Sequence, residues 1–353
     1  MGYNDYICIT NTYKTIMRAL IFSIIAISFL LVPVTTVAQD MAYPIEGDGI
    51  TSFLRRWNRI DSTYFNEFVE INKDRINDSY NLELGTVYLI PELLPGDIYP
   101  PLVSIEQPTD TKVFGKKYSE VPLRSNTLKD ACFYIISGHG GPDTGAITRI
   151  NEHELHEDEY AYDFSLRLAR NLMMDGATVY IIIQDPNDGI RDERILSSSN
   201  NETCMGQPIP KPQIDRLQQR VEKVNDLYKR DKDKFKYIRA IELHIDSRSP
   251  NERIDLFFYY ADDPQSRLSS YTLRNELLKQ YQLHQPGRGF VGNVSHRDLY
   301  VMRKLEVPNV LLEIGNFQNN LDRERILSSN NRHAIANWLL EGFLADYKRV
   351  IEQ

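Results

Sequence analysis

The feature that most constrains this fold is an alternation of short apolar runs with longer amphipathic segments from residue 128 onward. Apolar runs of this length predict buried strands, and the segments between them have the spacing of helices that bury one face. This alternation is typical of an α/β fold with a mostly parallel, twisted sheet flanked by helices. The predicted strands are 131–136, 178–183, 238–243, 255–260 and 309–312, and the predicted helices are 158–174, 211–231, 266–282 and 331–349.

The first apolar run ends at a glycine-rich loop, Gly138 to Gly145, that contains His139. The glycines allow tight backbone turns, so His139 is free to face a cleft at the carboxyl end of its strand. Open α/β sheets form their sites at this edge. Taken alone, such a stretch is more often an ordinary turn than a site.

Three more polar groups occupy comparable places. His244 follows the strand at 238–243, Glu313 follows the strand at 309–312, and acidic residues open the helix near 157. Two histidines and one carboxylate with an open fourth position form a catalytic zinc site. A second, unligated carboxylate then moves the proton of the activated water. His139, Glu157, His244 and Glu313 supply such a set.

Each of these residues also has an ordinary structural interpretation. A lone histidine after a strand is usually a hydrogen-bonding residue, and acids at a helix start are favoured by the helix dipole. Glu313 is harder to explain, because an ionised carboxylate in an apolar strand needs a partner or a role. Asp246 has two open interpretations, since it either orients a neighbouring histidine or is a turn residue.

The first 38 residues have the pattern of a secretory signal peptide. Lys14 and Arg18 precede an apolar run at 19–34, and the small residues that follow predict cleavage near Ala38. We therefore expect an exported protein that meets a membrane only through this segment; an uncleaved anchor is the alternative. The net charge of −8 argues against nucleic acid as a partner. The three cysteines do not suggest a disulfide framework.

Residues 44–91 have the pattern strand, helix, helix, strand, which predicts a small βααβ domain. The segment resembles a LysM module, and the resemblance implies binding to glycans that contain N-acetylglucosamine, such as peptidoglycan. A small structural cap of the same topology is the alternative. Residues 92–127 contain five prolines and are expected to form a linker that wraps the next domain. The residues that carry the LysM resemblance are Gly47, Asp48, Asn72, Gly85, Ile90 and Pro91.

Residues 128–350 resemble the catalytic domain of the zinc-dependent N-acetylmuramoyl-L-alanine amidases of the amidase_3 family. Two departures concern the loop after the first strand. Ile136-Ser137 stand where the family commonly has Asp-Pro, and the stretch from His139 to Glu157 is a few residues longer than the family's. The matching motifs are Gly138 to Ala146, a glutamate one helix before Gly176-Ala177-Thr178-Val179, His244 with Asp246-Ser247, and Pro308 with Val310-Leu311 and Glu313.

The resemblance implies one Zn²⁺ per catalytic domain, with His139, Glu157 and His244 as ligands and Glu313 as the catalytic glutamate. Glu159 is the runner-up for the acidic ligand, and His153 and His156 are more distant alternatives. The implied reaction is hydrolysis of the amide bond between N-acetylmuramic acid and L-alanine in peptidoglycan. Such an enzyme is expected in the periplasm or at the cell wall.

Two other functions stay open at this point. A zinc peptidase acting on other cell-wall amide bonds would use the same site chemistry. A catalytically weak regulator that binds peptidoglycan would share the fold. A wall hydrolase also needs restraint, so an activating or inhibiting protein partner is a further expectation. The charged helix at 211–235 and the segment 261–297 are the two places where such a partner is expected, and the choice between them stays open. The charged face of the helix has a solvated surface as its alternative interpretation.

Overall fold

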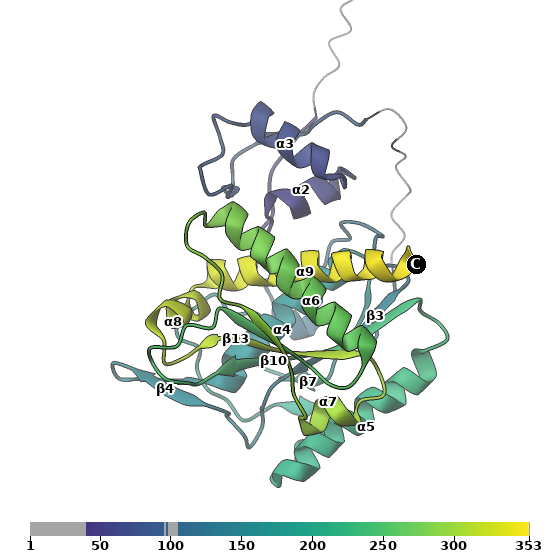
Figure 1. Ribbon diagram of the computed structural model, residues 1–353, viewed down its shortest axis with the longest axis vertical. Coiled ribbons are helices and arrows are strands. Elements are labelled where there is room, and N and C mark those ends of the chain that lie inside the picture. Colours follow the sequence, from purple (N-terminus) through teal and green to yellow (C-terminus); the bar gives the residue numbers. More distant parts are fainter. Residues whose placement is uncertain (1–39, 95–96, 98–104, 353) are drawn as a thin grey trace, which may run out of the picture. The chain divides into compact units, whose positions relative to one another are not determined.

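The computed structural model describes residues 40–94, 97 and 105–352 (Figure 1). The predicted signal peptide, residues 1–38, lies outside the described residues. Within the described part, no helix combines the length and the apolar character that a membrane crossing requires.

A six-stranded sheet lies at the centre of the C-terminal domain, residues 128–352 (Figure 1). Four of its strand pairs are parallel, and β11 runs antiparallel to β13. The mostly parallel sheet predicted from the sequence is confirmed, as a mixed sheet. In spatial order the strands are β12 (Asn293–His296), β11 (Leu256–Tyr260), β13 (Asn309–Asn316), β10 (Tyr237–Asp246), β3 (Ala131–Ser137) and β6 (Thr178–Ile181).

Helices cover both faces of this sheet. On one face, Phe133 and Ile135 pack with α4, α6 and α9, and on the other, Tyr134 and Ile136 pack with α5 and α7. This alternation follows from the two-residue period of a strand, which sends neighbouring side chains to opposite faces. The helices are α4 (Glu157–Met174), α5 (Gln213–Asp231), α6 (Pro264–His284), α7 (Tyr300–Lys304), α8 (Asn320–Leu327) and α9 (Ser329–Ile351).

The strands β10 and β13 are longer than the apolar runs that predicted them. His244 and Glu313 were expected just past the strands, but both lie inside them and are register partners. The apolar pattern stops early because the strands continue into the polar edge of the sheet.

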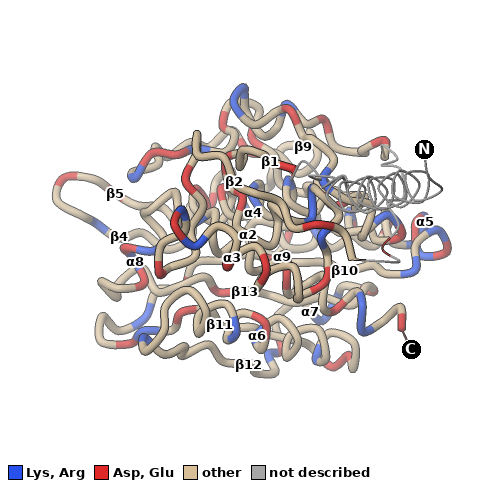
Figure 2. Tube along the Cα trace, turned by 90° about the horizontal axis from the view of Figure 1, so that it is seen from above, with Lys and Arg blue, Asp and Glu red and all other residues tan. Residues whose placement is uncertain are grey.

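Two smaller sheets have no such apolar pattern. The first is a hairpin of β4 (Ile147–Ile150) and β5 (His153–His156), which extends away from the central sheet (Figure 2). The second consists of β7 (Ile183–Gln184), β8 (Thr203–Cys204) and β9 (Gln207–Pro208).

The N-terminal module, residues 41–91, has the predicted order of strand, helix, helix and strand. Its first strand lies before residue 44, where the unit was expected to begin. An aromatic cluster of Phe53, Phe68 and Tyr88 forms its core. The side chain of Asn72 joins the end of α3 to β2 by bonding the backbone of Leu89. The elements are β1 (Met41–Ala42), α2 (Ile50–Arg56), α3 (Ser62–Ile71) and β2 (Tyr88–Leu89), with β1 and β2 antiparallel.

Residues 105–127, the described end of the predicted linker, lie against the C-terminal domain. The side chains of Gln107 and Thr109 bond the backbone of Ala177 and of β6, at the edge of the sheet. A short 3-10 helix, η1 (Thr111–Phe114), follows, and Phe114 is fully buried. These contacts satisfy polar groups that an edge strand otherwise exposes.

A buried ion-pair network joins the N-terminal module to the C-terminal domain. Arg55 lies 3.1 Å from Asp175 and 2.6 Å from Glu341. Asp175 also pairs with Arg124, at 3.0 Å. Burial raises the pKa of Asp175, but the two arginines outweigh it and hold that pKa below its usual range.

We expect Arg55→Leu to lower the free energy of unfolding by about 3 kcal/mol, because it leaves buried carboxylates with one partner fewer. Equilibrium unfolding in urea measures this change. The exposed Arg75 of the same module provides the control. Arg75→Leu should change stability by less than about 0.5 kcal/mol. Equal effects of the two substitutions would contradict a structural role for the Arg55 network.

Candidate metal centre

Three of the predicted site residues converge at one edge of the sheet. The Nε2 atom of His139 lies 3.2 Å from Oε1 of Glu157, and Nδ1 of His244 lies 2.8 Å from the same oxygen. The two imidazole rings meet edge to face, with centroids 5.0 Å apart. One potential ligand atom from each residue falls within a 4.8 Å group, so the three side chains could hold a single cation.

The topology explains this convergence. His139 follows β3 and His244 lies near the end of β10, and these strands are parallel neighbours with Ser137 opposite Leu243. Glu157 is the first residue of α4, where the helix dipole favours a negative charge. Backbone N–H groups of Ala146 and Ile245 donate to its carboxylate, at 2.9 and 3.2 Å.

The loop backbone is specialised at His139 and Gly138. His139 has a φ of 60°, a left-handed conformation that is uncommon for residues other than glycine. A Cβ at Gly138 would overlap the ring of His244. Gly138 therefore permits a close approach between the loop and the ring of His244. The sequence predicted only that the glycines allow tight backbone turns, not this contact.

Carboxylates bond the outer nitrogen of each imidazole. Asp143 lies 3.0 Å from Nδ1 of His139, and Glu242 lies 3.3 Å from Nε2 of His244. In metal sites, such partners fix the tautomer and the orientation of the ligating ring. The nitrogens that face Glu157 are consequently the ones available to a cation.

Helix α5 reaches this loop with two buried arginines. Arg216 donates to Asp143 at 2.7 Å, and Arg220 donates to the carbonyl of His139. The 211–235 segment was interpreted as either a solvated face or a partner surface. Figure 2 shows charged residues of both signs along α5, but Arg216 and Arg220 are buried against the His139 loop.

The carboxylates around the two imidazoles favour a bound proton or cation at this site. Burial lowers the pKa of His139, but Asp143 and Glu157 outweigh it and raise that pKa to about 9. The pKa of His244 is likewise raised well above its usual value, because Glu157 and Glu242 outweigh burial. The histidines in turn hold the pKa of Glu157 below its usual range despite its burial. Protons and divalent cations compete for such a site.

Glu313 lies beside this group on β13, opposite His244 in the strand register. Its Oε2 atom is buried and has no hydrogen-bond partner in the described part of the chain. Burial raises the pKa of this carboxyl to about 8, and the charge of His244 only partly opposes the rise. An unpaired buried carboxyl oxygen is costly, so this position points to a role in chemistry.

The other candidates lie elsewhere. Glu159 pairs with Arg191 at 2.7 Å and belongs to a separate buried group with Asp158 and Glu202. His156 is near Glu154 and His153 is exposed in β5. Asp246 bonds Arg248, and it is Glu242 that contacts the outer nitrogen of His244.

Sequence reasoning missed several supporting residues. Asp143 lies within the glycine-rich motif, and Glu242 is two residues before His244 on the same face of its strand, so both had a local signal. Arg216 and Arg220 had none, because a long excursion of the chain separates them from the loop they contact.

The fold and this site define an α/β protein with three potential metal ligands beside Glu313, whose Oε2 atom is buried and unpaired within the described residues. Residues 134–345 match the family Amidase_3, described as N-acetylmuramoyl-L-alanine amidase. The match spans more than half of the chain, and the chain belongs to this family.

Similar proteins include the probable cell wall amidase LytH of Staphylococcus saprophyticus, which is 25% identical over 219 residues. That alignment covers 62% of this chain and 59% of the relative, so the chain spans about six-tenths of the relative's length. N-acetylmuramoyl-L-alanine amidase AmiC2 of Nostoc punctiforme is 20% identical, with 65% of this chain and 99% of that chain covered and a TM-score of 0.44. The CwlD amidase from Clostridioides difficile, solved in complex with the GerS lipoprotein, is 16% identical, with 62% and 98% covered and a TM-score of 0.43.

Proposed function

We propose that this protein is a zinc-dependent N-acetylmuramoyl-L-alanine amidase that cleaves the amide bond between N-acetylmuramic acid and L-alanine in peptidoglycan. The observation that carries the proposal is the convergence of His139, Glu157 and His244 beside the unpaired carboxyl oxygen of Glu313. Membership of the Amidase_3 family supports the substrate class. Two imidazoles and a carboxylate are a donor set that suits one zinc ion.

Each residue of the site has a separate role in the proposed hydrolysis. A zinc ion, when bound, supplies Lewis acidity that lowers the pKa of water and polarises the amide carbonyl. In its ionised form, Glu313 accepts the proton of the attacking water through its unpaired oxygen and returns it to the L-alanine nitrogen as the C–N bond breaks. Water is thereby added across the amide: the lactyl group stays on the glycan as a carboxylic acid, and the stem peptide leaves as an amine. Asp143 and Glu242 keep the imidazoles oriented.

We further propose that the N-terminal module is LysM-like and holds peptidoglycan glycans, and that the chain is exported to the periplasm or the cell wall. The order β1–α2–α3–β2 and the positions of Gly47, Asp48 and Asn72 support the first part. The sequence pattern of residues 1–38 supports the second. A protein partner that displaced α5 would act on the centre through Arg216 and Arg220, since both contact the His139 loop.

Digestion of purified sacculi tests the reaction, with mass spectrometry of the products. We expect free stem peptides together with intact glycan strands. Shortened peptides that stay linked to glycan would instead identify a peptidase. Sacculi bound without any product would identify a catalytically weak regulator.

We expect Gly138→Ala to reduce hydrolysis of soluble muramoyl peptide by at least about tenfold, because the new Cβ overlaps the ring of His244. Steady-state kinetics measures the loss, and the zinc content of the purified protein shows whether the ligand has moved. Gly206, where a Cβ meets no atom within 4 Å, provides a control outside the centre. Its φ of 81° makes Gly206→Ala costly for stability, but activity per folded molecule should stay near wild type. Unchanged kinetics in Gly138→Ala would refute the close-approach argument.

A further inference from the structure

Asp158, Glu159 and Glu202 form a separate cluster of close carboxylates, which we call the acidic group. One carboxylate oxygen of each residue lies within 4.8 Å of the others. The three residues are 2%, 1% and 6% exposed, respectively. Asp158 and Glu159 belong to the first turn of α4, and Glu202 directly precedes β8. Ionised carboxylates that are buried this deeply are costly unless cations or hydrogen-bond donors face them.

The acidic group carries more negative charge than its neighbours offset. Glu159 pairs with Arg191 at 2.7 Å, but Asp158 and Glu202 have no ion pair within the described part of the chain. The Oδ1 atom of Asp158 accepts a hydrogen bond from the N–H of Glu159 at 3.0 Å, whereas its Oδ2 atom is buried and has no partner among the described residues. An unpaired oxygen on a buried carboxyl that lies against two other carboxylates points to a bound cation.

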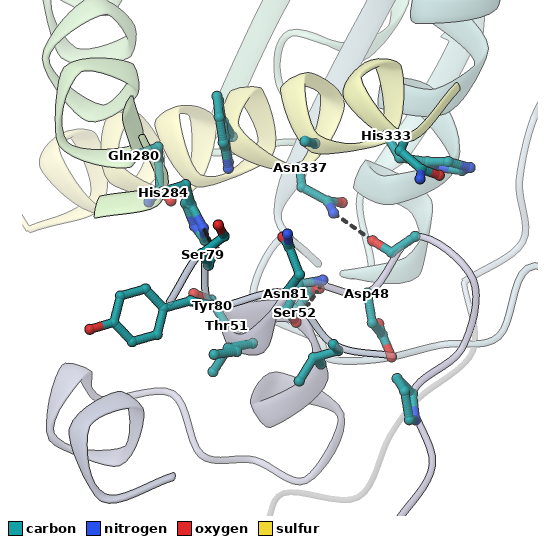
Figure 3. A pocket seen from close by; sticks show the side chains of 18 of the residues that line it. Asp48, Thr51, Ser52, Ser79, Tyr80, Asn81, Gln280, His284, His333 and Asn337 are labelled. Atoms are coloured by element: carbon teal, nitrogen blue, oxygen red, sulfur yellow. Dashed lines mark hydrogen bonds between the residues drawn. The ribbon is translucent and has the colours of Figure 1, made fainter. Parts of the chain in front are cut away.

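Another cluster of this kind receives its cation from the chain itself. Glu46, Asp192 and His333 also place one potential ligand atom each within 4.8 Å. The Nζ atom of Lys117 lies 2.7 Å from the carboxylate of Glu46 and 2.6 Å from that of Asp192. Glu46 and His333 line a groove beside α9, and Figure 3 labels His333 there. In the described part of the chain, no lysine lies within ion-pair distance of the acidic group, so that group has no equivalent of Lys117.

The acidic group also contacts the loop that carries His139. The N–H of Gly141 donates to Oε2 of Glu202 at 2.8 Å, and this hydrogen bond is buried. The N–H of Asp158 donates to the carbonyl of Thr144 at 3.3 Å. A ligand that holds Glu202 and Asp158 in place therefore also holds the backbone of this loop at two points.

We propose that the acidic group is a cation site that takes one Ca²⁺ ion, separate from the three proposed zinc ligands. Its donors are all carboxylate oxygens, which suit the hard cations Ca²⁺ and Mg²⁺ better than zinc. Ca²⁺ accepts irregular arrangements of carboxylates, whereas Mg²⁺ demands near-ideal octahedral geometry and retains several waters. The two positive charges of Ca²⁺ offset Asp158 and Glu202, while Arg191 offsets Glu159. The ion is structural, because it joins the start of α4 to the chain before β8 and positions the His139 loop through Glu202.

Isothermal titration of the whole chain with calcium chloride tests the site, in calcium-free buffer and on protein purified with its zinc. We expect one Ca²⁺ per chain, and at least about tenfold weaker affinity in each of Asp158→Asn and Glu202→Gln, because each substitution removes a charged ligand. Mg²⁺ should bind more weakly than Ca²⁺. Asp226→Asn is the matched control, because Asp226 is exposed on α5 and outside the acidic group, and it should bind Ca²⁺ as wild type does.

Thermal unfolding and hydrogen exchange separate a cation site from ordinary buried carboxyls. Added calcium should raise the Tm of the wild-type chain but not that of Asp158→Asn. Calcium should also slow backbone hydrogen exchange in the loop 138–145 of the wild-type chain, and not in the variant. If Asp158→Asn changed the Tm by the same amount with and without calcium, Asp158 would have a purely structural role and the proposal would be wrong.

Three further results would overturn the site. If millimolar calcium did not bind, a shared proton would be what relieves the repulsion within the acidic group. Wild-type affinity in both Asp158→Asn and Glu202→Gln would place the calcium elsewhere. A content of two zinc ions per chain that falls to one in Asp158→Asn would make the acidic group a zinc site. Hydrolysis of soluble muramoyl peptide is measured in parallel: hydrolysis without calcium binding overturns only this site, and calcium binding without hydrolysis overturns only the proposed reaction.

Discussion

Glu313→Gln is expected to lower the rate of muramoyl-peptide hydrolysis by at least about 100-fold while the protein keeps its zinc. The amide has nearly the same size as the carboxyl, so the buried site on β13 stays filled, but it cannot accept the proton of the attacking water. The unpaired Oε2 atom is the group that the substitution removes from the chemistry. Steady-state rates and the zinc content of the purified variant measure the two effects separately.

Glu306→Gln is the matched control for this experiment. Glu306 lies seven residues earlier, is about half exposed and pairs with Lys229 at the surface. Its substitution should leave both the rate and the zinc content near wild type. If Glu313→Gln hydrolysed the substrate at a near-normal rate, Glu313 would have no part in proton transfer. Loss of zinc together with activity would instead assign it to metal binding.

Glu157→Gln should weaken zinc binding by at least about 100-fold, whereas Glu159→Gln should bind zinc nearly as tightly as wild type. Only the carboxylate of Glu157 approaches both imidazoles, at 3.2 and 2.8 Å. Glu159 pairs with Arg191 and accepts from the backbone of Ser199, so its loss should lower stability without removing a ligand. Competition with a chelator of known affinity gives the zinc affinity of each variant.

The opposite pattern of zinc binding would make Glu159 the metal ligand and Glu157 the structural residue. Zinc binding that survives in Glu157→Gln but not in Glu159→Gln would require α4 to rotate, because the two residues lie on different sides of the helix. The thermal unfolding of both variants distinguishes a lost ligand from a lost fold. Added zinc should raise the Tm of Glu159→Gln but not that of Glu157→Gln.

The choice between these two glutamates shows where sequence reasoning stops. Successive helical residues are about 100° apart, so residues 157 and 159 point in widely different directions. Which of them faces the imidazoles depends on the rotation of α4, and burial of its apolar face against the sheet and α9 sets that rotation. The sequence names both acids, but only the packing selects one.

Local patterns were sufficient for much of the rest. Apolar runs located the five predicted strands, the glycines around His139 marked the loop, and the cost of burying Glu313 marked it as a residue with a role. These inferences hold because strand period, backbone freedom and desolvation are properties of a residue and its near neighbours.

What only the tertiary structure decided involves partners distant in the chain. The contacts of Arg216 and Arg220 with the His139 loop bridge more than seventy residues, and Arg55 meets Glu341 across most of the chain. The sequence by itself determined the chemistry available at each position, and the packing of α4, α5 and α9 decided which of those groups meet.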